Sequence, residues 1–323
     1  MKACILDYQS LCPEDLNLQN LWDCTLDGQT VEWNLHDSTP ATLTAERIKQ
    51  QDIILTNKVV LDAALLEANP AIRCIIILAT GTNNVDLVAA KRLGITVCNI
   101  VAYSTESVVQ QTFAMMLALK SQLLPFNQAV KQGDWCKSHF FGLLDYQINE
   151  VANTTLGIIG FGSIGKRIKV VAEAFGMKVL VAESLSGAVI EGRVPLAQLY
   201  AEADVISIHS PLTPESKNLV TAQAFASMKP SAILLNLGRG GIVNEEDLAA
   251  ALMSQQIAGA ATDVLTQEPP KPEHILLDVT IPNLLVMPHT AWASRQARQQ
   301  LVNQVVDILQ SLNTKAIKNC VNK

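Results

Sequence analysis

The sequence lacks long hydrophobic runs, paired-cysteine motifs and clusters of basic residues. No apolar stretch approaches the roughly 18 residues that a membrane-spanning helix needs, and the chain opens without the long apolar segment of a secretory signal. The seven cysteines are scattered and contain no CxxC pair, so they indicate reduced thiols rather than a disulfide framework or a zinc site. These absences predict a cytoplasmic protein with no membrane partner and no metal.

Charge is also scarce, since charged residues make up 17% of the chain and leave a net charge of −6. A negative chain without a Lys/Arg cluster is not expected to have a nucleic-acid partner. Hydrophobic residues make up 49% of the 323 residues, which is typical of a compact protein and sufficient for two domains. The sequence has no internal repeat and no low-complexity tract.

A glycine-rich turn, GFGSIG at residues 160–165, is the most informative motif that is present. It follows the apolar run 156–159 and opens a predicted helix at 164–175. A second apolar run, 179–182, leads to Glu183. Strand, glycine turn, helix, strand and acid in this order form the dinucleotide-binding fingerprint, in which the N-terminus of the helix binds the pyrophosphate. The motif therefore predicts a nucleotide cofactor.

Glu183 bears on which cofactor is used. A carboxylate at this strand end can accept hydrogen bonds from the adenosine ribose hydroxyls, and it repels a 2′-phosphate. The following residues, SLSG at 184–187, contain no Lys or Arg that would bind such a phosphate. The sequence therefore favours NAD over NADP and leaves the use of both open. Outside the fingerprint, Glu183 would be interpreted as a solvated acid.

Short β-branched runs alternate with helix-like segments, a pattern typical of parallel sheets covered on both faces. We predict an α/β fold with two doubly wound parallel-sheet domains: a Rossmann cofactor domain at 103–289, and a smaller flavodoxin-like substrate domain at 1–102 plus 290–323. A final helix at about 294–312 is expected to return to the first domain. The predicted strands are 2–7, 31–36, 52–56, 72–78, 96–99, 155–159, 178–182, 204–209, 232–237, 259–263 and 284–287.

Two further segments contain many apolar side chains. Residues 105–123 are predicted to form one nearly continuous apolar helix, which suggests burial between domains or between subunits. The irregular segment 137–150 contains Phe140, Phe141 and Tyr146. It is interpreted equally well as a functional loop and as simple packing.

An Arg, an acid and a His follow successive strands of the predicted cofactor domain: Arg239, then Asp263 with Glu268 shortly after it, then His289. Because the carboxyl ends of parallel strands meet at one edge of a sheet, we expect the three to lie together. An Arg fork holds a carboxylate and polarises a carbonyl, a His donates a proton to the reduced oxygen, and an acid beside the His favours its charged form. Singly, each has a structural explanation. Together they predict reduction of a 2-keto acid by hydride.

Over nearly its whole length the chain resembles the D-isomer-specific 2-hydroxyacid dehydrogenases. The similarity lies in "TNKVVLD", "ATGTNNVDLVAAKRLGI", "TLGIIGFGSIGKRI", "HSPLTPESKNLV", "LLNLGRGGIVNEEDL", "TDVLTQEPP" and "MPHTAWAS". Within the family it is most similar to the glycerate dehydrogenase, or hydroxypyruvate reductase, subgroup, through "ATGTNNVD", "YSTES" and residues 138–140. The resemblance implies NAD-dependent reduction of hydroxypyruvate to D-glycerate or the reverse, glyoxylate as a second substrate, and a homodimer, to which the apolar helix also points.

The resemblance also implies roles for individual residues. Arg239 would orient the substrate, His289 would be the general acid and base, and Glu268 its partner. His209 could border the nicotinamide end of the cofactor, and a structural role explains it equally well. Trp292 could line the substrate pocket, and packing between the domains explains it equally well. His274 is expected to be solvated. The implied substrate contacts are Thr80, Gly81, Thr82, Arg239 and Trp292. The implied cofactor contacts are Gly160, Phe161, Gly162, Ser163, Ile164, Gly165, Glu183, His209, Leu237, Gly238, Asp263 and Thr290.

Other functions remain open at this level. A reductase for another small 2-keto acid would carry the same motifs, and so would a non-metabolic NAD(H) sensor on this scaffold. Formate dehydrogenases resemble the family but carry Gln at the position of Glu268, so this residue argues against that activity.

Overall fold

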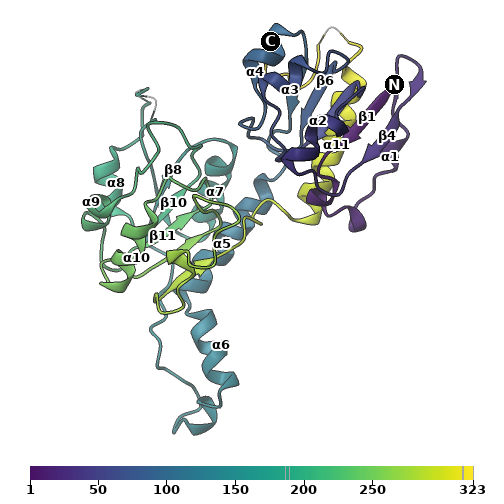
Figure 1. Ribbon diagram of the computed structural model, residues 1–323. Helices are drawn as coiled ribbons and strands as arrows, with labels where there is room; N and C mark the ends of the chain where they lie inside the picture. The colour runs from purple at the N-terminus through teal and green to yellow at the C-terminus, as the bar shows by residue number, and fades with distance from the viewer. Residues whose placement is uncertain (186, 189, 315, 323) are drawn as a thin grey trace. The chain divides into compact units, whose positions relative to one another are not determined.

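The computed structural model describes residues 1–185, 187–188, 190–314 and 316–322. Figure 1 shows two compact units, of which unit 1 comprises Met1–Ser104 with Ala293–Lys323 and unit 2 comprises Thr105–Trp292. The predicted boundaries, 102/103 and 289/290, lie within three residues of these divisions. The substrate role of unit 1 stays a prediction.

Unit 1 is built on a five-stranded parallel sheet in the order β4-β1-β5-β6-β7. Numbered along the chain this order is 2-1-3-4-5, that of a flavodoxin-like sheet. Each strand lies inside its predicted range, and the predicted fold class is confirmed for this unit. The strands are β1 (Lys2–Ile5), β4 (Glu32–Leu35), β5 (Ile53–Thr56), β6 (Cys74–Ile77) and β7 (Thr96–Asn99), and a hairpin of β2 (Thr25–Leu26) and β3 (Gln29–Thr30) is separate from the sheet.

Successive residues of these strands pack on opposite layers of helices, as the pleat of a strand requires. On one face Ile5 and Ile76 pack with Leu301 and Val305 of the last helix, which returns to unit 1 as predicted. The other face packs against α3 and α4. The helices of this unit are η1 (Tyr8–Leu11), η2 (Pro13–Asp15), α1 (Gln19–Trp22), α2 (Ala41–Arg47), α3 (Ala63–Glu67), α4 (Leu87–Arg92) and α11 (Arg295–Ser311).

Unit 2 is built on a six-stranded parallel sheet in the order β13-β12-β11-β10-β8-β9. The strand order reverses between β8 and β10, and ligands of doubly wound sheets bind at the carboxyl ends of the strands beside such a switch point. The predicted fold class is confirmed here as well. The strands are β8 (Thr155–Ile159), β9 (Lys178–Val181), β10 (Val205–Ile208), β11 (Ile233–Asn236), β12 (Gly259–Thr262) and β13 (Leu284–Val286).

Two layers of helices cover this sheet. The layer of α5 and α7 packs on Ile158 and Leu235, and the layer of α8, α9 and α10 packs on Ile206 and Leu234. Because all these strand residues are buried, the sheet is covered on both faces as a parallel sheet must be. The helices are α5 (Thr105–Lys120), α6 (Leu123–Lys131), η3 (Trp135–Lys137), α7 (Ser163–Ala174), α8 (Leu196–Glu202), α9 (Ala222–Ala226), α10 (Glu245–Met253) and η4 (Ile275–Leu277).

The prediction that residues 105–123 form one helix is wrong. The helix α5 ends at Lys120, and Gln122, in a left-handed conformation with φ of 52°, precedes the separate helix α6. The apolar side of α5 lies in the core of unit 2, where Phe113, Met116 and Leu119 pack under the sheet. Burial in the core of unit 2 thus accounts for much of its apolar composition, and the predicted burial between domains or subunits stays a prediction.

Several large apolar side chains are exposed on α6 and on the chain that follows it. We call residues 121–149 the arm; Figure 1 shows α6 and the returning chain projecting from the rest of unit 2. Asn149 N donates to Lys120 O at 2.9 Å and closes the base of the arm. Inside it, the rings of Phe126 and Tyr146 meet edge to face, 5.0 Å apart. The arm is thus an ordered structure of its own.

Candidate active site

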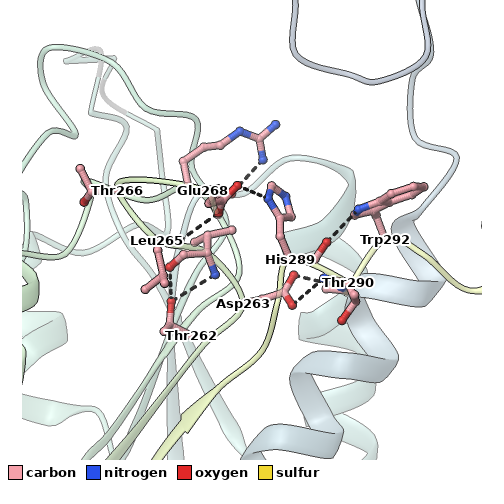
Figure 2. Close-up of polar contacts among 12 residues, drawn as sticks. Thr262, Asp263, Leu265, Thr266, Glu268, His289, Thr290 and Trp292 are labelled. Atoms are coloured by element: carbon pink, nitrogen blue, oxygen red, sulfur yellow. Dashed lines mark hydrogen bonds and ion pairs between the residues drawn. The ribbon is translucent and has the colours of Figure 1, made fainter. Parts of the chain in front are cut away.

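The carboxyl ends of β11, β12 and β13 bring chemically complementary side chains to one edge of unit 2. The three strands are neighbours, with Thr262 of β12 in register with Asn236 of β11 and Val286 of β13. Arg239, Glu268 and His289 lie in the segments that follow them. Figure 2 shows the side chains of Glu268 and His289 pointing toward one another.

The contact between Glu268 and His289 defines the chemistry of the site. Nδ1 of His289 lies 2.6 Å from Oε2 of Glu268, and both side chains are partly exposed, at 26% and 31%. An ionised carboxylate only accepts hydrogen bonds, so the proton of this contact is on Nδ1. This leaves Nε2 as the nitrogen that exchanges a proton with a ligand. A carboxylate held here also stabilises the imidazolium.

Asp263 fixes the backbone on which His289 is presented. Its buried carboxylate accepts N–H groups of Thr290 and Ala291, both at 2.9 Å (Figure 2). Burial raises the pKa of Asp263, and these two N–H groups oppose the rise. His289 itself has a φ of 54°, and Trp292 Nε1 donates to its carbonyl at 2.9 Å. A left-handed non-glycine residue persists where neighbouring contacts impose it, as they do here.

Arg239 is exposed on a turn held by Asn236. The Asn236 side chain donates to Arg239 O at 3.1 Å and accepts Gly238 N at 3.2 Å, and Nη1 of Arg239 donates to Gly238 O at 2.8 Å. The next residue, Gly240, is so close to the neighbouring segment that an added Cβ would lie 1.9 Å from Leu265 O. Only glycine permits this approach, which joins the turn of Arg239 to the loop of Glu268.

A second carboxylate, not anticipated from the sequence, holds the loop of Glu268. Glu245, in the first turn of α10, accepts Thr266 N at 2.7 Å and lies 3.2 Å from Nε2 of His274. The prediction that His274 is solvated is wrong, because its side chain is only 14% exposed. Glu268 Oε1 in turn accepts Leu265 N at 3.0 Å. The loop is thus fixed on both sides of Thr266. Glu245 and His274 are 29 residues apart, so no local sequence pattern reveals their contact.

The glycine turn of residues 160–165 has the shape of a dinucleotide cradle. A Cβ on Gly165 would lie 2.3 Å from Gly160 O, so this glycine lets α7 pack on the turn. A Cβ on Gly162 would meet nothing within 4 Å, which means that the space above this exposed residue is open. No side chain among the described residues caps the N-terminus of α7 at Gly162. Its N–H groups can therefore receive a pyrophosphate, and these residues fit a dinucleotide cofactor.

We expect a substitution at Gly165 to affect the stability of the fold and a substitution at Gly162 to affect cofactor binding. Gly165→Ala should lower the free energy of unfolding by about 2 kcal/mol, since its Cβ would overlap backbone. Gly162→Ala should leave unfolding unchanged and weaken NADH binding roughly tenfold, since its Cβ enters the space that the pyrophosphate needs. Urea unfolding without ligand and fluorescence titration with NADH measure the two effects. This account would be contradicted if the Gly162→Ala variant were less stable than the Gly165→Ala variant, or if it bound NADH with unchanged affinity.

His209 lies at the switch point, directly after β10. Its Nε2 is 2.7 Å from Ser207 Oγ, and its buried Nδ1 has no hydrogen-bond partner among the residues that the structure describes. Its backbone lies close to Gly160, where a Cβ would be 2.6 Å from the carbonyl carbon of His209. This position is beside the glycine turn. The predicted cofactor contact stays a prediction.

The imidazole of His209 should make stability depend on pH. Burial lowers its pKa from 6.5 to about 3. Above pH 6.5 the group is neutral in both states and stability is complete; as the pH falls toward 3, the unfolded chain binds a proton that the folded chain does not. The free energy of unfolding should therefore fall by about 2 kcal/mol between pH 7 and pH 5 on this account.

Urea unfolding at pH 7 and pH 5 checks this expectation. His209→Gln should lose most of the dependence, and His139→Gln, which changes an exposed residue of the arm, should keep it. A His209→Gln chain with the dependence of the unaltered protein would rule out His209 as its source.

The remaining predicted contacts lie in unit 1. Residues 80–82 form a loop after β6 in which Thr80 is exposed and Gly81 and Thr82 are partly buried. Thr80 Oγ1 donates to Ile100 O at 2.9 Å, and Asn99 Nδ2 donates to Thr80 O at 2.8 Å. Their role toward a substrate stays a prediction. Within the described ranges no group of three His, Cys, Asp or Glu side chains is placed to hold a metal ion. No helix in that part of the chain has the length and apolar character to cross a membrane.

Comparison with known proteins identifies the family. The model of the "D-isomer specific 2-hydroxyacid dehydrogenase, NAD binding domain" matches residues 113–291, more than half of the chain. The protein therefore belongs to the D-isomer specific 2-hydroxyacid dehydrogenases, as the resemblance of its motifs implied, and it contains their NAD-binding domain.

Individual relatives agree with this assignment. A glycerate dehydrogenase from Methylorubrum extorquens is 45% identical over 262 residues, which cover 81% of this chain and 82% of that protein. A hydroxypyruvate reductase from Blautia hydrogenotrophica is 35% identical over 327 residues and covers 100% of both chains.

Solved structures of the same fold bind either cofactor. A D-lactate dehydrogenase from Aquifex aeolicus, complexed with NAD and lactic acid, has a TM-score of 0.79 at 26% identity, with 96% of this chain and 95% of that one covered. An NADPH-dependent glyoxylate/hydroxypyruvate reductase from Sinorhizobium meliloti, in complex with NADP and malonate, has a TM-score of 0.79 at 26% identity, with 99% and 96% covered.

Proposed function

We propose that this protein reduces hydroxypyruvate to D-glycerate with NADH, or catalyses the reverse oxidation, and that glyoxylate is a second substrate. The observation that carries the proposal is the 2.6 Å contact between His289 and Glu268 at the sheet edge where Arg239 is also presented. The names of the two relatives with 45% and 35% identity support the choice of substrate.

Each side chain has a separate task in this reaction. When bound, NADH would supply the hydride for C2 of the keto acid. Arg239 is exposed on a fixed turn, so its fork can hold the substrate carboxylate and polarise the carbonyl. Nε2 of His289 donates the proton to the carbonyl oxygen, and Glu268 stabilises the imidazolium beforehand. In the oxidation of D-glycerate, the same nitrogen removes the hydroxyl proton.

We assign cofactor binding to unit 2. The backbone of residues 80–82 in unit 1, and the side chains of Arg239 and Trp292 in unit 2, would contact the substrate. Leu237, Gly238, Asp263 and Thr290 would line the nicotinamide side of the cofactor site, together with His209. We retain the cytoplasm as the predicted compartment, on the scattered spacing of the seven cysteines.

NADH is the preferred cofactor in this proposal because of Glu183. Its exposed carboxylate follows β9, where it can accept hydrogen bonds from the ribose hydroxyls and repel a 2′-phosphate. Ser184 and Leu185 add no positive charge, and Ser186 lies outside the described residues.

We infer that the protein is a homodimer in which a second copy covers the arm. The arm exposes Phe140, Phe141 and Leu144 at 77%, 99% and 86%. Large apolar side chains exposed on one segment are suited to burial against a partner, and a like copy of the arm offers the same apolar surface.

Changing the arm should therefore change the oligomeric state. The double variant Phe140→Ser with Phe141→Ser is expected to convert the dimer to a monomer at micromolar concentration, as light scattering after size exclusion would measure. Val279→Ser is the matched control, since Val279 is 97% exposed outside the arm. A double variant that stays dimeric, or an unaltered protein that is monomeric, would contradict the assignment.

Initial rates of NADH oxidation test the reaction itself. Hydroxypyruvate, glyoxylate and pyruvate are compared side by side with the purified protein, and hydroxypyruvate should give the highest kcat/KM. If NADH binds but none of the three acids is reduced, the proposed substrates are wrong. The site then serves another keto acid or senses the cofactor.

A further inference from the structure

Arg193 is a cation that the fold brings back to the cofactor cradle. It follows Glu183 by ten residues and is the only Lys or Arg between 183 and 194. After β9 the chain loops out and returns, because Glu183 N donates to Val194 O and Val194 N donates to Val181 O, each at 2.9 Å. Ala182 and Val194 form a parallel bridge. Arg193 is therefore a neighbour of the strand end that presents Glu183.

The guanidinium of Arg193 is held against the glycine turn. Its Cζ lies 5.7 Å from the ring centroid of Phe161, the residue between the first two glycines of the motif. Such a cation–π contact holds the guanidinium without neutralising it, and none of the ion pairs among the described residues involves Arg193. A half-buried, oriented and unneutralised cation is suited to binding an anion.

The position of Arg193 distinguishes between the phosphates of a nucleotide cofactor. The pyrophosphate has its own site at the N-terminus of α7, which presents free backbone N–H groups. Arg193 is on the side of β9, where the Glu183 carboxylate receives the adenosine ribose. A phosphate esterified to that ribose is the anion within its reach.

We propose that Arg193 binds the 2′-phosphate of NADPH, and that the protein accordingly accepts NADPH as a second cofactor behind NADH. Glu183 repels the phosphate and Arg193 attracts it, so the balance of the two side chains sets the preference. The inference deepens the proposed function and rests on it for the cofactor's position. It also changes the conclusion drawn from residues 184–187, which contain no cation for a 2′-phosphate, because Arg193 supplies that cation from the far end of the loop.

Binding of nucleotide fragments tests the proposal without any substrate. The probes are 2′,5′-ADP, which carries the 2′-phosphate, and 5′-AMP, which does not. Isothermal titration calorimetry on the full chain should show that Arg193→Leu, which keeps an apolar stem on Phe161, weakens 2′,5′-ADP about 10- to 100-fold, the equivalent of one charged hydrogen bond. Binding of 5′-AMP should change by less than about twofold. Arg193→Lys should restore part of the loss.

Steady-state rates supply the second readout. In Arg193→Leu, kcat/KM for NADPH should fall by the same factor as the 2′,5′-ADP affinity, while the value for NADH stays constant. Arg73→Leu removes one positive charge from an exposed ion pair in unit 1 and should alter neither.

Three results would overturn the assignment: no binding of 2′,5′-ADP by the unaltered protein, no change in Arg193→Leu, or equal losses for both probes, which would place Arg193 on a phosphate common to both cofactors. A chain that binds 2′,5′-ADP through Arg193 but reduces no hydroxypyruvate would refute the proposed reaction alone.

Discussion

His289→Asn is expected to lower kcat for hydroxypyruvate reduction about 1000-fold, because Asn cannot donate the proton that the carbonyl oxygen requires. Asn is the matched replacement, since it tolerates the left-handed backbone that His289 adopts, with φ of 54°. The loss therefore reports chemistry rather than a changed turn. Stopped-flow or steady-state measurement of NADH oxidation gives kcat, and NADH affinity should stay within about twofold.

Glu268 provides the control for this result. Glu268→Gln should cost about 10- to 100-fold in kcat, because it removes the charge that stabilises the imidazolium and leaves the ring in place. The double variant should be no slower than His289→Asn alone, since the task proposed for Glu268 in proton transfer passes through its 2.6 Å contact with His289. If the two losses multiply, Glu268 has a role of its own and the assignment of tasks is wrong.

Arg239→Gln should have the second large effect, a fall of about 100- to 10,000-fold in kcat/KM for hydroxypyruvate. The estimate corresponds to losing two charged hydrogen bonds of roughly 1.5–3 kcal/mol each. Arg239→Lys keeps the charge without the fork and should lose less. NADH affinity serves as the control, because the cradle of residues 160–165 does not include this side chain.

A substrate without a carboxylate completes that experiment. Hydroxyacetone has the carbonyl and the hydroxyl group but no anion, so it should be a poor substrate for the unaltered protein. It should lose less than hydroxypyruvate in Arg239→Gln, because only the contact with the carbonyl is then removed. Equal losses with both compounds would mean that Arg239 acts on the carbonyl alone, or that its turn has been distorted.

The sheets and the contact between Glu268 and His289 were predictable because their signals are local. Each strand of both sheets is a short apolar run between turn residues, and each lies inside its predicted range. The order of strands then places Glu268 and His289 at one edge of the sheet, independently of the conformation of the loops. The hydrophobic pattern and the parallel direction of the strands are therefore enough to predict this arrangement.

What the sequence did not reveal depends on contacts between distant residues. The break between α5 and α6 occurs at Gln122, a residue with no special preference for the left-handed conformation that it adopts. His274 is protected by Glu245, and Arg193 reaches Phe161 only because its loop returns along β9. In each case the local sequence is compatible with a solvated loop. The decisive partner lies elsewhere in the chain.

The return of α11 to unit 1 has a consequence for synthesis on the ribosome. The strands of unit 1 lie within the first 99 residues, yet one face of their sheet packs on Leu301 and Val305, which are made two hundred residues later. Unit 2, in contrast, has all its strands and helices between residues 105 and 286. Domains fold as units once their residues have emerged. Unit 2 should therefore complete its core first. Most of unit 1 is synthesised earlier, but one apolar face of its sheet stays uncovered until α11 has been synthesised.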